Sequence, residues 1–353
     1  NRLNFTGDYY IRDTKDMLTS GVALPSVYGA DSPKMNSADL RTKGYELSLS
    51  WRDEFQLLRR PFTYSVTVTF NDYVTDITKY DNPDRTFAKS YYEGMRWGEI
   101  WGYRIGGLFA TDAEAAGYAV DQTAVNNRIN AAAGSERGLH AGDLKFLDLD
   151  GDNIISIGKN TVDDPGDRKI IGNSEPRYLY TISLNADWNG FFLSALFDGV
   201  GRQQWFPSDE SLFWGMYNRP YNQVPTWHLQ NYWTEERPNA YLPRYVGYYG
   251  PMNANTVNVN TRYLQDVSYI RLKNLQFGYE LPKRWISKIG LSKVSVYFSG
   301  ENLWSWSPLY RHTKDFDVTV ASKKSDSDIS NSKGDGHNYP VMRSFSFGIS
   351  ITY

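Results

Sequence analysis

Cysteine is absent from this chain of 353 residues, which excludes disulfide bonds and thiolate metal sites. Histidine is scarce, and none of the four (His140, His228, His312 and His337) lies at metal-ligand spacing from another. No run of about 18 apolar residues occurs, so the sequence predicts no transmembrane helix. The net charge of −2 gives no argument for nucleic acid as a partner. No nucleophile turn or glycine-rich phosphate loop can be recognised, so we expect no enzymatic activity.

Aromatic residues, in contrast, are abundant. The chain has 27 Tyr, 17 Phe and 11 Trp, or 16% of its residues, although its mean hydropathy is only −0.56. A soluble core does not need so many aromatic residues with so little aliphatic bulk. Transmembrane β-barrels do, because they place aromatic girdles at both lipid interfaces and polar side chains in the lumen. The composition therefore favours an all-β transmembrane protein.

Alternation of apolar and polar residues predicts eight β-strands. Each segment has one apolar and one polar face, as a strand between lipid and a polar lumen requires. The eight segments are Leu3–Arg12, Tyr45–Arg52, Tyr64–Asn71, Tyr178–Trp188, Phe191–Asp198, Tyr269–Glu280, Lys293–Ser299 and Phe345–Tyr353.

One of these strands changes phase. In Tyr269–Glu280 the apolar residues fall on even positions before Lys273-Asn274 and on odd positions after it. A β-bulge inserts one extra residue and restores a single apolar face, so we predict a bulge at this point.

Short and long connections alternate along the chain. Short links are expected at Asp53–Pro61, Asn189-Gly190 and Leu281–Ser292, and long loops at Asp13–Gly44, Asp72–Arg177, Gly199–Ser268 and Gly300–Ser344. Outer-membrane barrels have long extracellular loops and short periplasmic turns. The pattern therefore predicts an antiparallel barrel wall in the Gram-negative outer membrane, with outer-membrane lipid as its surroundings.

Aromatic residues also mark the strand ends that this arrangement places in the periplasm. With the exception of Val294, the apolar-face residue nearest each such end is aromatic, and we expect these residues at one height on the barrel wall. They are Phe5, Trp51, Tyr64, Trp188, Phe191, Tyr279 and Tyr353. A soluble β-sandwich, the competing interpretation, has no reason to align aromatic residues with strand ends.

Twelve short motifs follow one another along nearly the whole chain. They are Gly142–Phe146, Asp148–Asp152, Ile171–Asn173, Glu175–Tyr178, Trp233-Thr234, Pro238–Ala240, Pro243-Arg244, Ser268–Asn274, Gly278-Tyr279, Leu281-Pro282, Glu301–Leu303 and Tyr339-Pro340. In order and spacing they resemble the C-terminal third of SusC/RagA-type TonB-dependent transporters of Bacteroidetes. Two departures are Thr313–Asp317, where an acidic-proline segment is usual, and Asn153, where glycine is usual.

The resemblance implies that residues 1–353 are the last eight strands of a barrel of about 22 strands, with the N-terminal plug and TonB box outside this chain. It implies import of glycans or peptides with a SusD-like surface lipoprotein, energised by the TonB–ExbB–ExbD complex. The aromatic last strand, Phe345–Tyr353, resembles the signal read by the barrel-assembly machinery. A passive porin or a surface adhesin is the alternative function, and it would lack the plug.

An acidic loop offers a candidate metal site. Asp148, Asp150 and Asp152 alternate, which lets carboxylates converge on one hard cation such as Ca2+, with Ile154 and Ser156 of the same loop. Lys159 stands where a calcium loop carries its last acid, and Asp163 or Asp164 are candidates to supply it. The alternative is an acidic turn whose side chains cap its own backbone.

The long loop Arg202–Gly250 is rich in aromatic residues. Aromatic faces can stack on sugar rings or pack on a lipoprotein lid, and the candidates for substrate binding are Trp205, Trp214, Tyr217, Tyr221 and Trp227. For most aromatic residues of this loop we favour the other interpretation, that they pack together to order it.

Overall fold

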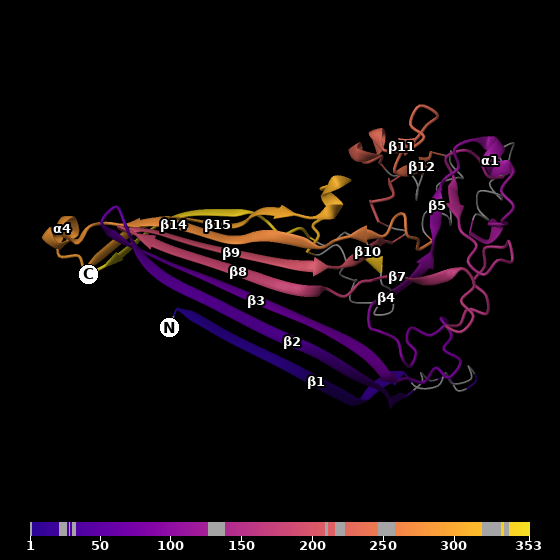
Figure 1. The fold of residues 1–353 in the computed structure, drawn as a ribbon, viewed down its shortest axis with the longest axis horizontal. Helices are drawn as coiled ribbons and strands as arrows, with labels where there is room; N and C mark the ends of the chain where they lie inside the picture. Colours follow the sequence, from indigo (N-terminus) through magenta and orange to yellow (C-terminus); the bar gives the residue numbers. More distant parts are fainter. Residues whose placement is uncertain are drawn as a thin grey trace.

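The computed structural model describes residues 2–20, 27, 29, 33–125, 138–208, 211–215, 223–245, 258–319, 333–334 and 339–353. Eight of its strands form one antiparallel sheet in the order β1-β2-β3-β8-β9-β14-β15-β17 (Figure 1). These strands are β1 (Leu3–Ser20), β2 (Lys34–Leu57), β3 (Arg60–Lys79), β8 (Arg177–Trp188), β9 (Phe191–Arg202), β14 (Tyr269–Glu280), β15 (Lys293–Trp306) and β17 (Ser344–Thr352).

The remaining elements are short and lie in the connections. They are β4 (Glu99–Tyr103), β5 (Ile105–Leu108), α1 (Asp112–Ala116), β6 (Leu144–Phe146), β7 (Arg168–Asn173), β10 (Gln204–Pro207), η3 (Thr226–Gln230), β11 (Tyr232–Trp233), β12 (Leu242–Arg244), β13 (Gln265–Asp266), α4 (Lys283–Ile286), η4 (Ser287–Ile289), η5 (Pro308–Arg311) and β16 (Lys333–Gly334). None of the helices in the described ranges combines the length and the apolar character needed to cross a bilayer.

All eight predicted strands are present in the sheet, but several predicted boundaries were wrong. β1 runs on to Ser20, and β2 begins at Lys34, inside the segment expected to be a loop. β3 likewise begins at Arg60, before the predicted start at Tyr64, and continues to Lys79, beyond the predicted end at Asn71. The cause is that main-chain pairing continues where the apolar face stops, so alternation marks only the part of each strand that has one apolar face.

The two ends of the sheet differ as expected. At the turn end, β2 and β3 are joined by the two residues Leu58 and Arg59, β8 and β9 by Asn189 and Gly190, and β14 and β15 by α4 and η4. At the loop end, long segments connect the strands: 80–176, 203–268 and 307–343, which we call the second, third and fourth loops. The turn end lies at the left of Figure 1 and the loop end at the right.

One face of the sheet is apolar and open to solvent. Large hydrophobic side chains on this face are 37–84% exposed, including Leu3, Phe5, Leu47, Leu49, Trp51, Leu193, Phe277, Trp304, Phe347 and Ile349. The opposite face carries small polar residues, such as Ser50 hydrogen-bonded to Thr67 and Thr69 to Thr181. A continuous exposed apolar face of this extent marks contact with lipid or protein.

The register aligns aromatic residues into a row across five neighbouring strands near the turn end. Phe55 pairs with Phe62, Phe62 with Trp188, Trp188 with Phe191, and Phe191 with Tyr279. The sequence pattern identified the last three and missed Phe55 and Phe62. Of the other predicted members, Trp51 and Tyr64 form an inner group through the bond from Trp51 Nε1 to the Tyr64 hydroxyl (3.1 Å), and Phe5 pairs with Leu49. The predicted aromatic residues therefore do not lie at a single height on the wall but are spread over several residues along the strands.

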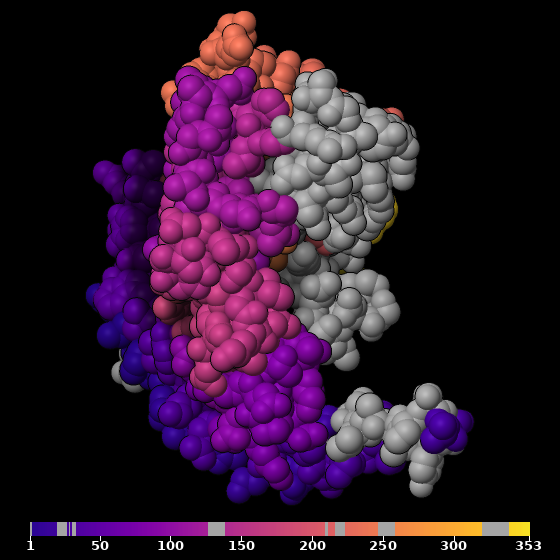
Figure 2. Space-filling view, turned by 90° about the vertical axis from the view of Figure 1, so that its right-hand side faces the viewer, coloured from indigo at the N-terminus to yellow at the C-terminus, as the bar shows by residue number. Residues whose placement is uncertain are grey.

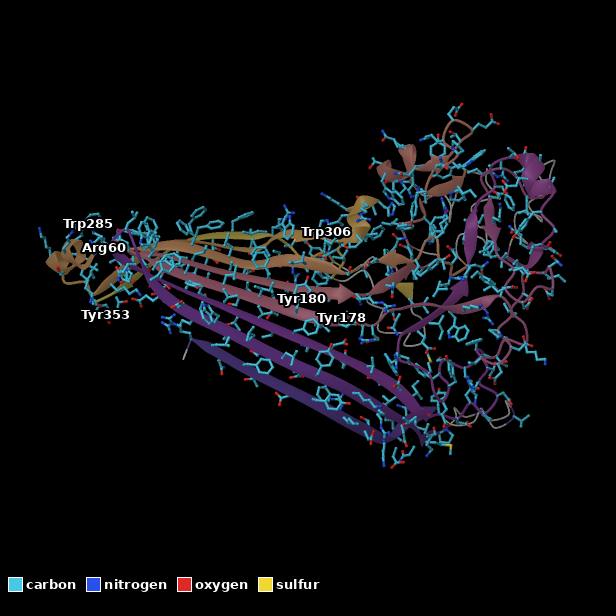
Figure 3. The ribbon with its side chains drawn as sticks, viewed as in Figure 1. Arg60, Tyr178, Tyr180, Trp285, Trp306 and Tyr353 are labelled. Carbon is cyan, nitrogen blue, oxygen red and sulfur yellow. The ribbon has the colours of Figure 1, made fainter. Side chains whose placement is uncertain are left out.

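Aromatic side chains also mark the loop end of the apolar face. Tyr178, Tyr180 and Trp306 lie there, whereas Trp285 and Tyr353 lie at the turn end (Figure 3). On β8 the ten residue steps from Tyr178 to Trp188 span about 33 Å along the strand at about 3.3 Å each. With a tilt of about 40°, this corresponds to a height of about 25 Å, the thickness of the apolar band of an outer-membrane barrel.

The bulge in β14 is confirmed. Its pairing with β9 goes from Leu272↔Phe197 to Asn274↔Leu196, which leaves Lys273 as the extra residue. Its pairing with β15 shifts at the same point, from Leu272↔Trp304 to Asn274↔Glu301. Beyond the bulge, on the polar face, aromatic rings and glycines alternate across four strands as Phe192, Gly278, Tyr297 and Gly348. A Cβ added at Gly348 would lie 2.3 Å from Cζ of Tyr297, so the ring needs a glycine opposite it.

The last strand pairs as expected on one side. β17 pairs with β15 from Lys293↔Thr352 to Glu301↔Ser344, and β1 pairs with β2. Within the described ranges, β17 and β1 are not paired with each other, so the sheet is an open wall whose two edge strands each have one neighbour.

We predict that the apolar face meets lipid, and two neighbouring substitutions in the full-length protein test this. Leu49→Arg places a charge on that face and should destabilise the protein by about 2–4 kcal/mol near the bilayer midplane. Ser48→Arg, on the polar face, should cost far less. Urea unfolding in lipid vesicles measures both. An equal loss of stability for the two variants would show that the orientation is wrong.

Candidate functional site: the loop layer above the sheet

The second, third and fourth loops pack together at the loop end, and we call their described residues the loop layer. Viewed from this end, the magenta residues of the second loop stand in front of the indigo strands (Figure 2). One hydrophobic cluster joins the three loops, with members from each: Tyr103, Val125, Leu144, Phe146, Ile155, Trp205, Phe206, Phe213, Trp214, Leu242, Tyr263, Val267, Leu309, Phe316 and Val318. The loop layer therefore has a core of its own, separate from the sheet.

Ring contacts and main-chain bonds cross between the loops in this core. Trp205 of the third loop lies 5.3 Å, centroid to centroid, from Phe316 of the fourth. The N–H of Tyr103 in the second loop donates to the carbonyl of Val259 in the third (2.8 Å). Gly102 permits this approach, because a Cβ there would lie 2.5 Å from the same carbonyl oxygen.

A buried ion pair links the second and third loops as well. Nε and Nη2 of Arg244 donate to the two carboxylate oxygens of Asp143, at 2.8 and 3.2 Å. The Asp143 side chain is only 2% exposed. A two-point Arg–carboxylate bond fixes the relative position of its partners, and removal of one partner leaves a buried charge uncompensated.

The predicted substrate-binding residues do not share one surface. Trp205 and Trp214 are fully buried in the cluster. Trp227 is half-buried and packs its ring against His228 at 4.3 Å and Phe213 at 5.1 Å. Tyr217 and Tyr221 lie outside the described residues. Packing thus accounts for Trp205 and Trp214, and contact of this loop with substrate stays a prediction.

His228 occupies the centre of this packing as a neutral residue. Its Nε2 lies 2.9 Å from the Phe213 carbonyl, which can only accept, so Nε2 carries the proton. Its Nδ1 then accepts from the Tyr245 hydroxyl. Burial lowers the pKa of His228 to about 4.

The acidic loop forms a cluster whose membership differs from the prediction. Carboxylate oxygens of Asp148, Asp150 and Asp167 lie within 4.8 Å of one another. The Asp152 carboxylate accepts instead from the N–H of Ile154 (2.7 Å). Asp163 and Asp164, the candidates for the distant acid, form ion pairs with Arg85 and Lys159.

The donor set fits a hard cation, and the loop also caps its own backbone. Asp148 accepts from the N–H groups of Gly151 and Asn153, which hold the pKa of its carboxyl below the usual range. At Asp150 the Asp152 amide lowers the pKa, but desolvation and the neighbouring carboxylates, Asp167 first, outweigh this and raise it. A cation would relieve that repulsion. Asp148, Asp150 and Asp167 would hold it through oxygen, as Ca2+ requires. Ile155 is fully buried, Ile154 is exposed, and the N–H of Ser156 donates to the Asp167 carboxylate (2.7 Å). A role of Ile154 and Ser156 as metal ligands stays a prediction.

A polar cavity of about 410 Å3 lies where the loop layer meets β3, β8 and β9. Its lining includes Arg96, Glu99 and Arg202. Two of its charged residues form ion pairs, Arg96 with Asp76 at 3.0 Å and Arg177 with Asp72. The cavity therefore offers both positively and negatively charged side chains for hydrogen bonding, and neither sign of charge dominates its lining. The sequence analysis did not identify it, because its lining comes from segments far apart in the chain.

No protein-family model matches the chain. TonB-dependent receptor P3 of Formosa agariphila is 28% identical over 366 residues, an alignment that covers all of this chain and 32% of the relative. TonB-dependent receptors P39 and P26 of the same organism are each 23% identical and cover 86% and 98% of the chain. The chain is thus similar in sequence to three TonB-dependent receptors over 86–100% of its length.

Solved structures agree with this relationship at the level of the fold. The structure of the RagAB peptide transporter covers the whole chain with a TM-score of 0.65 at 18% identity, and its "open-open" state gives 0.64 at 19%. The chain spans about a third of the length of these receptors and transporters. These proteins are named as TonB-dependent receptors and as a peptide transporter, not as enzymes.

Lowering the pH should loosen the loop layer through His228. Since burial lowers its folded pKa to about 4 from 6.5, the unfolded form binds more protons between these values. The contribution of neutral His228 to the free energy of unfolding, on the order of 3 kcal/mol, is fully present above pH 6.5 and is lost as the pH falls towards 4. Hydrogen exchange of the full-length protein at pH 7 and 5, corrected for intrinsic rates, measures this. His228→Gln, which keeps a donor and does not titrate, should flatten the dependence; an unchanged slope would contradict the assignment.

Calcium binding at the acidic loop is a second prediction. Tb3+ luminescence of the full-length protein should report a site that Ca2+ competes for. Asp150→Asn should weaken it at least about tenfold, because a metal carboxylate is lost. Glu235→Gln, which removes an exposed loop acid, is the matched control. No sensitised emission, or equal affinity in both variants, would leave backbone capping as the role of these acids.

Proposed function

We propose that this chain forms part of the wall of an outer-membrane importer that takes up glycans or peptides with energy from TonB. The observation that supports this most directly is the alignment of the whole of residues 1–353 with about a third of a receptor named as TonB-dependent. The exposed apolar face with aromatic residues at both ends gives independent support for a position in the membrane. In this proposal the turn end faces the periplasm and the loop end faces the outside of the cell.

The open edges of the sheet have a place in this proposal. In lipid each unpaired backbone group costs several kcal/mol, so the free edge of β17 pairs with the first strand of the complete barrel. The aromatic strand ending at Tyr353 is read by the barrel-assembly machinery. Energy coupling through the TonB–ExbB–ExbD complex resides in a plug and TonB box outside residues 1–353.

The loop layer is the surface offered to a partner and to substrate. A SusD-like lipoprotein is the proposed partner, as the resemblance in sequence motifs implies, and the solved structure similar in fold is named as the RagAB peptide transporter. A layer with its own packed core is a firm platform for such a lid. The three other predicted substrate-binding residues of the third loop, Tyr217, Tyr221 and Trp227, are proposed to contact substrate. A bound Ca2+ at Asp148 and Asp150 would order the second loop.

Uptake with and without TonB tests the proposal. Cells of the native organism that express the full-length protein should accumulate labelled oligosaccharides or oligopeptides, and deletion of the TonB gene should abolish the uptake. Binding of the substrate to the cell surface should survive that deletion, which serves as the internal control. Uptake that continues without TonB would indicate a passive porin, and surface binding with no uptake in either strain would indicate an adhesin.

A further inference from the structure

Two connections at the turn end share an unusual composition. The β2–β3 turn and its first strand residue are Leu58, Arg59 and Arg60, and the β14–β15 connection, residues 281–292, contains α4 and η4. Together these segments hold five cations, namely Arg59, Arg60, Lys283, Arg284 and Lys288, and no acidic residue. We call the two segments the basic rim.

Large apolar side chains stand among these cations. Leu58 is 78% exposed, Trp285 56% and Ile289 71%. All five cations are exposed as well. None of the ion pairs found among the described residues includes one of these five cations, and the nearby Asp53 and Glu280 pair instead with Arg2 and Lys293. Exposed apolar residues interspersed with cations match a surface that is apolar in one layer and anionic in the next.

The β2–β3 turn keeps this composition in a strained backbone. Leu58 has φ of 51° and Arg59 of 62°, close to the region in which Asn189 and Gly190 make the β8–β9 turn. Asn and Gly adopt this left-handed conformation readily, whereas a leucine or an arginine there is strained. Strain of this kind persists where the side chains serve a purpose. The turn holds Leu58 and Arg59 outward at the end of the wall.

The β14–β15 connection continues the aromatic row by other means. At the turn end of β15 the apolar-face residue is Val294 rather than an aromatic residue, and Val294 is buried. α4 packs on the start of this strand with Ile286 buried, and Trp285 of the same turn is exposed. Trp285, Arg60 and Tyr353 all lie at the turn end in Figure 3. The rim is therefore continuous with the face assigned to lipid.

We propose that the basic rim binds the anionic phospholipid surface at the turn end of the wall. Leu58, Trp285 and Ile289 insert at the level of the acyl-chain boundary, and the five cations contact headgroup phosphates. Aromatic and aliphatic residues with flanking Lys and Arg bind membrane interfaces in this way. The inference rests on the proposed function for its membrane, but it adds a lipid class and the residues that select it.

Spin labels on introduced cysteines test the depth of the rim, which is convenient because the chain has no cysteine of its own. Full-length protein with Leu58→Cys or Ile289→Cys is placed in nanodiscs of phosphatidylcholine with one-third phosphatidylglycerol. Both labels should be more accessible to oxygen than to a water-soluble nickel relaxant. Lys159→Cys, whose native side chain is 84% exposed in the loop layer, gives the value for bulk water.

A label at Leu49→Cys, in the middle of the apolar face, separates the two ideas. If this label lies in hydrocarbon while the rim labels behave as in bulk water, the rim inference is overturned and the membrane position stands. If the Leu49 label is also in water, the proposed membrane wall itself has failed. Rim labels that are in water in nanodiscs but protected in whole cells would mean that the rim binds a periplasmic protein, which also overturns the inference.

Lipid selectivity tests the cations. Quenching of protein fluorescence by brominated phosphatidylglycerol relative to brominated phosphatidylcholine measures the preference for the anionic lipid. Arg59→Gln with Arg60→Gln should lower this preference by up to about fivefold for each cation removed, the usual effect of a basic residue at an anionic surface. Lys89→Gln with Lys159→Gln removes the same charge at the loop end and should leave it unchanged. Equal preference in the two double variants would overturn the proposal.

Discussion

Main-chain hydrogen bonding is the constraint on which the rest of this structure depends. Hydrocarbon offers no partner for an N–H or C=O group, so each strand must be bonded to neighbours over its whole depth in lipid. The six inner strands have such partners on both sides, and β1 and β17 have them on one. The same ladders carry β2 and β3 well past the level at which their apolar faces end. Pairing thus sets the length and order of the strands, and side chains decide only which face meets lipid.

Together, the strand pairing and the pleat align the aromatic residues near the turn end. Because residues directly opposite one another share a face, a fixed register brings Phe55, Phe62, Trp188, Phe191 and Tyr279 into one row. A slip of one residue in any pair would turn that strand's aromatic residue to the polar face. Short turns help to fix the register, and two of the three turn-end connections are two-residue hairpins, one of them with Leu58 and Arg59 in a left-handed backbone.

What the sequence could predict follows from how far apart the interacting residues are. Alternation within a strand is local, so it located all eight strands and the bulge at Lys273. The aromatic row needed the register between strands, which is why Phe55 and Phe62 were missed. Asp167 joins Asp148 although it is far beyond the motif, because the chain folds back through bonds from Leu149 and Ser156 to its carboxylate. Burial of Trp205 and Trp214 depends on three loops meeting, which no single segment records.

The long loops are ordered mainly by each other, although the second loop also bonds to β3 through the main chain of Gly94 and Trp97. A long loop alone cannot offset the conformational entropy it loses, because it has too few apolar side chains to form a core. Three loops that share one cluster can, and the Asp143–Arg244 pair lies where the second and third of them meet. Removal of one loop's contribution would therefore expose the apolar surface of the others, so the layer should order as a unit. A partner or substrate that arrives from the loop end then meets a preformed surface and need not supply the free energy of ordering it.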